Sequence, residues 1–391
     1  MRIGVDGACW ANPRGYGRFA REILPALMAQ SPEFEWLIFM DAEAERAFEM
    51  PERGRIRIVR VGVETPAHAA SAETFRSPAD LLRMTVAVRR ERLDVLFAPS
   101  VYTFFPLPRG QRAVVTIHDA IPERFPALTM PTRRARWFWN AKVWLALRQA
   151  RLILTVSDYA ARQIETVLGV ARERIRVATE APAAAFAPSD DAAAIAAAVA
   201  PWGLGPGDRW FVYVGGFNPH KRVDRIVRAH ADAVRGAVRP PHLLLVGNPA
   251  GDRFYKSVDA IRAAIEASGT PSLVHWLGWV DDTTLRYIHA GALALVLVSE
   301  SEGFGLPAVE AAACGAPVIA TTESPLPGLL AGGGTFVDPG DHETLVVAMK
   351  RMIDDEEGRR AMGRRARQAA AALTWDRAAR VTLAALLEAA A

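Results

Sequence analysis

Two glutamates flank a glycine-rich segment in the second half of the chain: Glu302 precedes and Glu310 follows Gly303-Phe304-Gly305-Leu306-Pro307. The segment follows the apolar run Leu293–Val298, which predicts a buried strand. Pro307 suits the first position of the next helix, which would put Glu310 in its first turn. A glycine loop between a strand and a helix N-terminus presents backbone N–H groups to an anion. The spacing therefore predicts a site for a negatively charged group between two carboxylates.

A second glycine loop carries a lysine, which is a rare residue in this chain. The segment Gly215-Gly216-Phe217-Asn218-Pro219-His220-Lys221-Arg222 follows the expected strand Trp210–Val214 and leads into a helix. Two adjacent cations at the carboxyl end of a strand favour an anionic ligand such as phosphate.

The N-terminal half contains two further candidates. Gly15-Tyr16-Gly17 lies between the expected strand Arg2–Val5 and a helix expected over Arg18–Ala29, and it fits either a phosphate cradle or a plain turn with positive φ. His118-Asp119 follows the expected strand Ala113–Ile117, at the end of the strand where parallel sheets place their sites. A single histidine there also fits a structural role.

Strand-like apolar runs alternate with helical segments along the chain, which predicts an α/β protein with parallel, doubly wound sheets. A chain of 391 residues exceeds what one core usually organises. The Ala- and Pro-rich stretch 186–207 predicts a linker between an N-terminal domain, 1–185, and a C-terminal domain, 208–374. The expected strands are Arg2–Val5, Trp36–Met40, Ile56–Val61, Asp94–Ala98, Ala113–Ile117, Leu152–Val156, Trp210–Val214, Leu243–Val246, Leu273–Leu277, Leu293–Val298, Pro317–Ala320 and Thr335–Val337.

Composition argues against several classes of protein. The net charge is only +4, so a general nucleic-acid binder is not indicated. Cys9 and Cys314 are too few for a disulfide scaffold or a cysteine metal cluster. No apolar run approaches the roughly 18 residues that a membrane-spanning helix needs. These features predict a cytoplasmic protein, peripheral to a membrane at most.

The segment 131–151 is rich in arginine and tryptophan and contains no acidic residue. Its apolar positions 137, 138, 141, 144 and 145 follow a helical period, which predicts a helix with this face packed on the sheet. The surplus of basic and aromatic residues also fits weak association with an anionic lipid surface or a lipid-phosphate substrate.

The spacing of Glu302 and Glu310 resembles the E-x7-E motif of the retaining glycosyltransferases of family 4, also called group 1. The run from His118 to Pro126 is most similar to the mannosyltransferases of bacterial surface-polysaccharide assembly. The resemblance spans nearly the whole chain, because other family motifs match in the same order: G-G-x-G-R at Arg14-Gly15-Tyr16-Gly17-Arg18, H-D at His118-Asp119, V-G-x(5)-K at Gly215 to Lys221, F-x-G-x-V-x-D at Leu277 to Asp282, and M-A-C-G-x-P-V at Ala312 to Val318.

This resemblance implies the GT-B fold, in which two Rossmann-like domains face each other across a cleft. The first would bind the acceptor and the second the donor nucleotide, with the last helix, 375–391, crossing back to the first. The implied partners are a nucleoside-diphosphate sugar and a glycan or lipid-linked acceptor in polysaccharide biosynthesis. GDP-mannose is the favoured donor and a UDP-hexose comes next. No cofactor and no metal are implied.

The resemblance also assigns roles to individual residues. Three are implied in catalysis: Glu302 near the reacting face of the donor sugar, Lys221 on the departing diphosphate, and His118 on the transferred sugar. Glu310 would accept hydrogen bonds from the ribose hydroxyls. The remaining implied donor contacts are Val280 on the base, Gly15, Gly17, Gly216, Arg222, and the backbone of Gly303, Phe304, Gly305 and Leu306.

Lys221 and the helix dipole would stabilise the leaving group and make a divalent metal unnecessary. The family retains anomeric configuration, which is generally attributed to front-face attack with the leaving phosphate taking the acceptor's proton. The chain departs from the family pattern at two positions. Gly216 replaces a common arginine, and either Arg222 or His220 substitutes for it or fewer charges hold the diphosphate. Arg14 replaces the first loop glycine.

Two other classes of function stay open on the sequence. A GT-B sugar-nucleotide epimerase or phosphorylase is opposed by the complete E-x7-E region and the lack of an evident pyridoxal-lysine motif. A non-catalytic sugar-nucleotide-binding protein is opposed by the presence of both Glu302 and Lys221.

Overall fold

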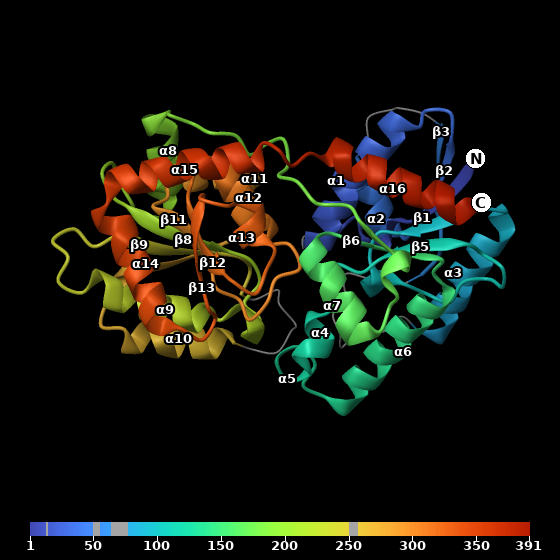
Figure 1. The fold of residues 1–391 in the computed structure, drawn as a ribbon, viewed down its shortest axis with the longest axis horizontal. Helices are drawn as coiled ribbons and strands as arrows, with labels where there is room; N and C mark the ends of the chain where they lie inside the picture. Colours follow the sequence, from blue (N-terminus) through green and yellow to red (C-terminus); the bar gives the residue numbers. More distant parts are fainter. Residues whose placement is uncertain (13–14, 50–54, 64–76, 250–256) are drawn as a thin grey trace. The chain divides into compact units, whose positions relative to one another are not determined.

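The computed structural model describes residues 1–12, 15–49, 55–63, 77–249 and 257–391, so Arg14 of the first glycine motif lies outside the described residues. The chain divides into two units, each built around its own parallel sheet (Figure 1). One unit comprises Met1–Glu180 and Thr374–Ala391, and the other comprises Ala181–Leu373.

The first unit has a seven-stranded sheet in the order β3-β2-β1-β4-β5-β6-β7, and all of its strand pairs are parallel. Its central strands are apolar and fully buried, as strands covered by helices on both faces must be. The order of the strands reverses between β1 and β4. The strands are β1 (Arg2–Asp6), β2 (Glu35–Met40), β3 (Arg55–Arg60), β4 (Val95–Ala98), β5 (Ala113–Thr116), β6 (Leu152–Thr155) and β7 (Ile175–Val177).

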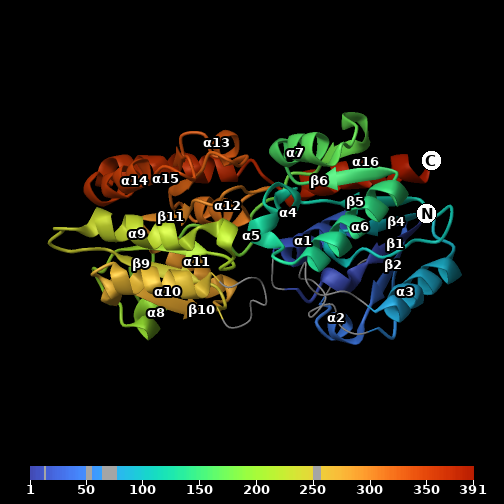
Figure 2. The same cartoon turned by 90° about the horizontal axis from the view of Figure 1, so that it is seen from below.

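The last helix of the chain belongs to this first unit. Helix α16 (Trp375–Ala390) packs along α1 (Gly15–Gln30) and contacts β4 to β7 (Figures 1 and 2). The expectation that the C-terminal helix returns to the N-terminal domain is therefore confirmed. The other helices of the unit are α2 (Ala42–Arg46), α3 (Pro78–Glu91), α4 (Ile121–Arg124), α5 (Pro126–Thr129), α6 (Arg133–Gln149) and α7 (Asp158–Leu168).

The second unit has a six-stranded parallel sheet in the order β10-β9-β8-β11-β12-β13. Its strand order reverses between β8 and β11, which are adjacent at the centre. Both sheets are thus doubly wound, as the alternation of apolar runs predicts. The strands are β8 (Trp210–Val214), β9 (His242–Val246), β10 (Val274–Gly278), β11 (Ala294–Leu297), β12 (Val318–Thr321) and β13 (Gly334–Val337).

The stretch 186–207, expected as a linker, lies inside the second unit in the structure. It contains α8 (Ala192–Val199), which packs against α11 (Asp282–Gly291). The remaining helices of the unit are α9 (Val223–Val234), α10 (Val258–Ala267), α12 (Leu306–Ala313), α13 (Leu326–Leu329), α14 (His342–Asp354) and α15 (Glu356–Ala370).

Helix α6 corrects the prediction about which face of the segment 131–151 is packed. The buried side chains are Ala135, Trp139, Val143 and Ala146, whereas Trp137 and Trp144 are exposed. The predicted and the observed buried positions both recur with a helical period, so periodicity alone did not determine which face of the helix is buried. The observed phase places two small alanines against the unit and gives the buried Trp139 ring N–H an acceptor in Glu123.

Among the described residues, no helix combines the length and apolar character needed to cross a membrane.

Candidate functional site

The candidate site of the second unit lies where its strand order reverses. The chain leaves β8 toward β9 on one side and leaves β11 toward β12 on the other. The loops that follow β8 and β11 therefore start from adjacent strands and diverge, which is the position where parallel α/β sheets bind ligands. Both glycine-rich segments with candidate residues are these loops.

The loop after β8 is held close to the neighbouring strand end. The Gly215 N–H donates to the carbonyl oxygen of Val246 at 3.0 Å. A Cβ atom at Gly247 would lie 2.2 Å from the Gly215 oxygen, so only glycine fits there. The loop continues through a 3₁₀ turn, Pro219–Lys221, to Arg222, which adopts a left-handed φ of 52° before α9.

The loop after β11 ends in a strained turn that only glycine adopts easily. Gly305 has a φ of +89°, and a Cβ there would lie 2.8 Å from the Leu326 side chain. Helix α12 begins directly afterwards at Leu306 with Pro307 in its first turn. Glu310 consequently lies in the second turn, not in the first turn as predicted. The first backbone N–H groups of α12 point out of its N-terminus, where an anion would be stabilised.

Lys221 and Glu302 join the two loops through a close ion pair. The Lys221 Nζ lies 2.7 Å from Oε1 and 2.9 Å from Oε2 of Glu302. The Ser299 hydroxyl donates to Glu302 Oε1 at 2.5 Å, and the Glu302 N–H donates to the Glu323 carbonyl oxygen at 3.0 Å. Glu302 is buried, and a buried carboxylate needs such partners. Both side chains are therefore fixed in position.

A second ion pair connects the same loops. The Arg222 guanidinium contacts the Glu300 carboxylate, and the Glu300 N–H donates to the His220 carbonyl oxygen at 2.8 Å. The structure thus places Arg222, one of the suggested substitutes for the family arginine, on a carboxylate of its own chain. Its evident role there is to brace the loop that carries Lys221.

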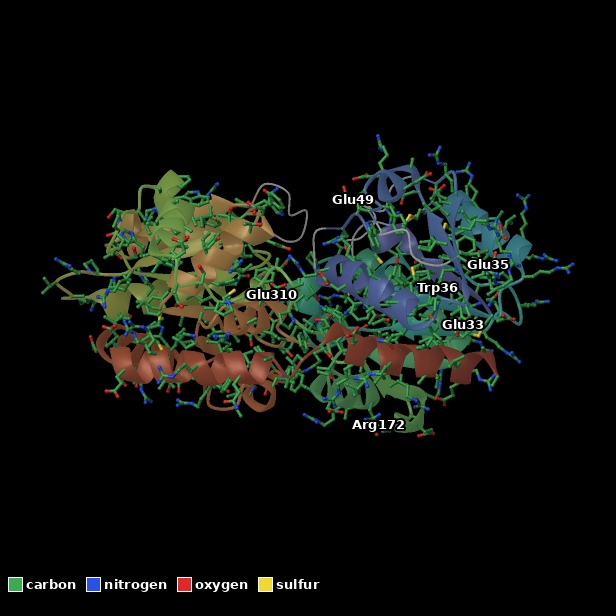
Figure 3. The ribbon with its side chains drawn as sticks, turned by 90° about the horizontal axis from the view of Figure 1, so that it is seen from above. Glu33, Glu35, Trp36, Glu49, Arg172 and Glu310 are labelled. Atoms are coloured by element: carbon green, nitrogen blue, oxygen red, sulfur yellow. The ribbon has the colours of Figure 1, made fainter. Side chains whose placement is uncertain are left out.

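The other candidate residues of this unit are distributed around these loops. Glu310 is buried on α12 (Figure 3), and the nearby Cys314 thiol has its pKa raised to about 12, by burial first and then by Glu310. The Gly216 carbonyl accepts a hydrogen bond from the Tyr213 hydroxyl. Val280 is buried just after β10, which is one of the two edge strands of the sheet. The side chains of Phe304 and Leu306 are buried as well, so a ligand would meet their backbone.

His118 is a candidate residue of the first unit, and it follows β5 as predicted. Its Nε2 lies 3.0 Å from the Pro99 carbonyl oxygen, and its Nδ1 lies 3.5 Å from Oε1 of the buried Glu180. The Phe19 ring, on α1, and the imidazole pack in an edge-to-face arrangement with 5.0 Å between ring centroids. The ring is therefore oriented from three sides.

Gly15 and Gly17 are the first and third residues of α1, which starts three residues earlier than predicted. Neither has a positive φ, so the interpretation as a plain turn with positive φ is wrong. A Cβ on Gly17 would lie 1.9 Å from the Asn12 carbonyl oxygen, whereas a Cβ on Gly15 would meet nothing within 4 Å in the part of the chain that the structure describes. Close approach thus requires glycine at position 17 only.

Glu123, in α4, is a notable residue that sequence reasoning missed. Its Oε1 accepts a hydrogen bond from the Trp139 ring N–H at 2.6 Å. Burial raises the pKa of this carboxyl to about 7, against the opposing effect of that hydrogen bond. Trp139 also begins a series of aromatic contacts, with Tyr102 at 4.8 Å between centroids and then Tyr102 with Tyr16 at 5.1 Å. The only signal in the sequence was an acidic residue inside the run His118 to Pro126.

Comparison with protein families identifies both halves of the chain. The model "Glycosyl transferases group 1" matches residues 196–369, and the model "Glycosyltransferase Family 4" matches residues 13–179. Together the two matches include most of the sequence, and each lies almost wholly within one structural unit.

Curated proteins with similar sequences include an O-antigen chain mannosyltransferase B from Escherichia coli. It is 27% identical over 75% of this chain and 74% of its own length. A D-inositol 3-phosphate glycosyltransferase from Nocardia farcinica is 33% identical over 58% of this chain, which aligns with about half (49%) of that relative.

Solved structures extend the similarity over the whole fold. Anabaena HepE, in complex with UDP and glucose, superposes with a TM-score of 0.72 at 17% identity and covers 99% of both chains. At this identity the likeness concerns the fold alone. The two doubly wound units, the returning C-terminal helix and the family matches agree with the GT-B fold, and the chain belongs to the group 1 glycosyltransferases of family 4.

Proposed function

We propose that this protein transfers a hexose from a nucleoside-diphosphate sugar to a glycan or lipid-linked glycan acceptor, with retention of anomeric configuration and without a metal ion. The observation that carries the proposal is the Lys221–Glu302 pair on the loops after β8 and β11. It places a cation and a carboxylate beside the N-terminus of α12, within the half of the chain that matches the group 1 model.

The charges at this site suit the loss of a diphosphate. Bond breaking at the anomeric carbon leaves negative charge on the nucleoside diphosphate and positive charge on the sugar. Lys221 and the backbone N–H groups that start α12 would stabilise the first, and Glu302 would face the second. Because a lysine and a helix start are placed for the leaving group, the proposal assigns no metal to it.

The remaining proposed roles are those that the resemblance to the family implies. Glu310 would accept hydrogen bonds from the ribose hydroxyls, since a carboxylate offers two acceptor oxygens to neighbouring OH groups. Val280 would contact the base, and the backbone from Gly303 to Leu306 would hold the distal phosphate. His118, in the first unit, would hydrogen-bond the transferred sugar.

GDP-mannose is the donor that we favour, with a UDP-hexose next. The run from His118 to Pro126 supports mannose, as does the name of the O-antigen mannosyltransferase relative. The UDP in the HepE complex supports the second choice. A polysaccharide-type acceptor follows from the same relative.

A donor screen followed by a transfer assay tests the proposal. We expect one class among the UDP-, GDP-, ADP- and TDP-sugars to raise the melting temperature, and we expect EDTA not to abolish that shift. NMR of the product should show the anomeric configuration of the donor. The Glu302→Gln variant should still bind the donor but should lose turnover, whereas Glu357→Gln, on the exposed start of α15, serves as the matched control.

Each part of the proposal has a contradicting result. Absence of a shift with every sugar nucleotide would overturn the donor class. Normal turnover of Glu302→Gln would remove its catalytic role. An inverted product, or activity that is lost in EDTA and restored by a divalent cation, would overturn retention or metal independence respectively.

A further inference from the structure

Helix α6 presents two large aromatic side chains to solvent. Trp137 is 65% exposed and Trp144 is 61% exposed. They are two helical turns apart and so lie on one face. This face is opposite the residues that pack against the unit, Ala135, Trp139, Val143 and Ala146.

Arginines surround the two rings. Arg133, Arg134 and Arg148 are exposed on the same helix, and the segment 131–151 contains no acidic residue. The Arg148 guanidinium lies over the Trp144 ring, 5.6 Å from its centroid. Positive charge and exposed aromatic surface therefore occur together. We call the set Arg133, Arg134, Trp137, Trp144 and Arg148 the α6 face.

The buried side of α6 is firmly attached, so the α6 face has a fixed orientation on the first unit. The Lys142 Nζ donates to the Tyr102 carbonyl oxygen at 2.8 Å. The Gln149 side chain exchanges two hydrogen bonds with the backbone of Leu107, at 2.9 and 3.1 Å. Trp139 is bonded to Glu123. The exposure of Trp137 and Trp144 is consequently not the result of a loosely attached helix that could rotate to bury them.

We propose that the α6 face binds the surface of a bilayer that contains anionic lipid. Tryptophan suits the boundary between headgroups and acyl chains, and arginine is attracted to anionic headgroups. A second copy of the chain would instead bring like charges together. The phosphates of a nucleic acid would attract the arginines. A nucleic acid has no apolar layer, however, that could receive both tryptophan rings as a bilayer does. This inference does not depend on which sugar the protein transfers.

Vesicle sedimentation of the full protein tests the proposal. Vesicles of phosphatidylcholine with about 30% phosphatidylglycerol are compared with pure phosphatidylcholine vesicles at low ionic strength, where the anionic surface potential is least screened. We expect binding to the anionic vesicles only, and we expect it to weaken as salt is raised. Replacing both rings, Trp137→Ala with Trp144→Ala, should lower the partition coefficient on the order of tenfold. Replacing Arg133, Arg134 and Arg148 by Gln should remove the preference for anionic lipid.

Trp279→Ala is the matched control, because Trp279 is 72% exposed in the second unit. We expect it to bind vesicles as the wild type does. Circular dichroism of each variant checks that it is folded. Equal binding to both vesicle types, an unchanged partition coefficient for the double tryptophan variant, or an equal loss in Trp279→Ala would overturn the proposal. Sedimentation without vesicles, or binding to heparin but not to vesicles, would also overturn it.

Discussion

The two units share a topology but place different chemistry at the same position in it. Each has a sheet whose strand order reverses at its centre, between β1 and β4 in the first unit and between β8 and β11 in the second. Each has a glycine-containing segment after the first of these strands. In the second unit the loops carry two ion pairs, Lys221–Glu302 and Arg222–Glu300. In the first unit the loop after β4 carries Tyr102, which stacks on Tyr16 of α1 and contacts Trp139. The oriented His118 follows β5, the strand next to β4.

Under the proposed function, the fold fixes where a ligand can bind, while the loop residues determine which ligand it is. Paired charges beside a helix start suit a diphosphate. Aromatic side chains and an imidazole suit a ligand whose rings carry many hydroxyl groups. The shifted pKa values differ as well, because burial raises the pKa of a carboxyl, Glu123, in the first unit and lowers the pKa of two histidines, His230 and His289, in the second. The following predictions test this contrast.

The largest effect is expected from Lys221→Ala, because the proposed role of this lysine is to stabilise charge that develops in the transition state. Removing one such group typically lowers kcat by about 100- to 1000-fold, or roughly 3 to 4 kcal/mol. Steady-state kinetics with the identified donor measure it. Lys350→Ala is the control, since Lys350 is exposed on α14. A loss below about tenfold at Lys221 would show that the charged loops are structural and would remove the contrast with the first unit.

Glu123→Gln should make the first unit less sensitive to alkaline pH. The Glu123 carboxyl has its pKa raised to about 7, so its contribution to stability is present below about pH 4.5 and is lost as the pH rises through 7. The loss approaches roughly 3 kcal/mol, since one pKa unit corresponds to about 1.4 kcal/mol. Glutamine keeps an acceptor for the Trp139 ring N–H. We therefore expect the variant to be more stable than the wild type at pH 8 and similar at pH 5.

Hydrogen exchange of β5 amides measures this effect in the first unit by itself. That choice matters because a chain with two units need not unfold in one step. Glu173→Gln, at an exposed position of the same unit, is the control. If the stability of wild type and Glu123→Gln changes equally with pH, the Glu123 carboxyl ionises in the folded protein without lowering its free energy of unfolding.

The second unit should respond to pH in the opposite direction. His289 is fully buried, neither ring nitrogen has a hydrogen-bond partner among the described residues, and burial lowers its pKa to about 3. Its contribution to stability is present above pH 6.5 and is lost as the pH falls toward 3. Between pH 7 and pH 5 the expected loss is about 2 kcal/mol. His230, whose pKa burial lowers to about 4, acts in the same direction.

His289→Leu should remove part of this acid sensitivity, because leucine has no group to protonate. Hydrogen exchange of β8 amides at pH 5 and pH 7 measures the change. If the variant and the wild type lose equal stability on acidification, His289 is not the cause, and the contrast between the two units in their buried groups would be weaker than we infer.

Much of the fold followed from the sequence, because strands buried on both faces of a parallel sheet must be continuous apolar runs. Within the described residues, every strand but one was expected within two residues of its observed bounds. The exception, β7, is three residues long, lies at a sheet edge and contains Arg176, so it lacks that signal. The prediction of which face of α6 is buried was wrong, because two faces of this helix are apolar enough to pack.

The candidate site could be predicted only as a set of residue types. Glycine and carboxylate spacing indicated both loops of the second unit. The sequence could not show that Lys221 pairs with Glu302, or that Arg222 is held by Glu300, because the partners are far apart in the chain and meet only through strand order. Glu123 was missed for a related reason, since its raised pKa depends on burial that no local pattern encodes.

The smallest expected effect comes from Gly15→Ala, and it separates a structural from a functional glycine in the first unit. Gly15 starts α1 without a positive φ, and a Cβ there meets no atom of the described residues within 4 Å. The substitution should therefore leave stability unchanged or raise it by up to about 1 kcal/mol, mainly through the unfolded chain. Gly17→Ala is the opposite control, because its Cβ would collide with the Asn12 carbonyl oxygen. If Gly15→Ala keeps its melting temperature but loses transfer activity, a ligand approaches the backbone at Gly15. If activity is unchanged, Gly15 is not part of the donor site.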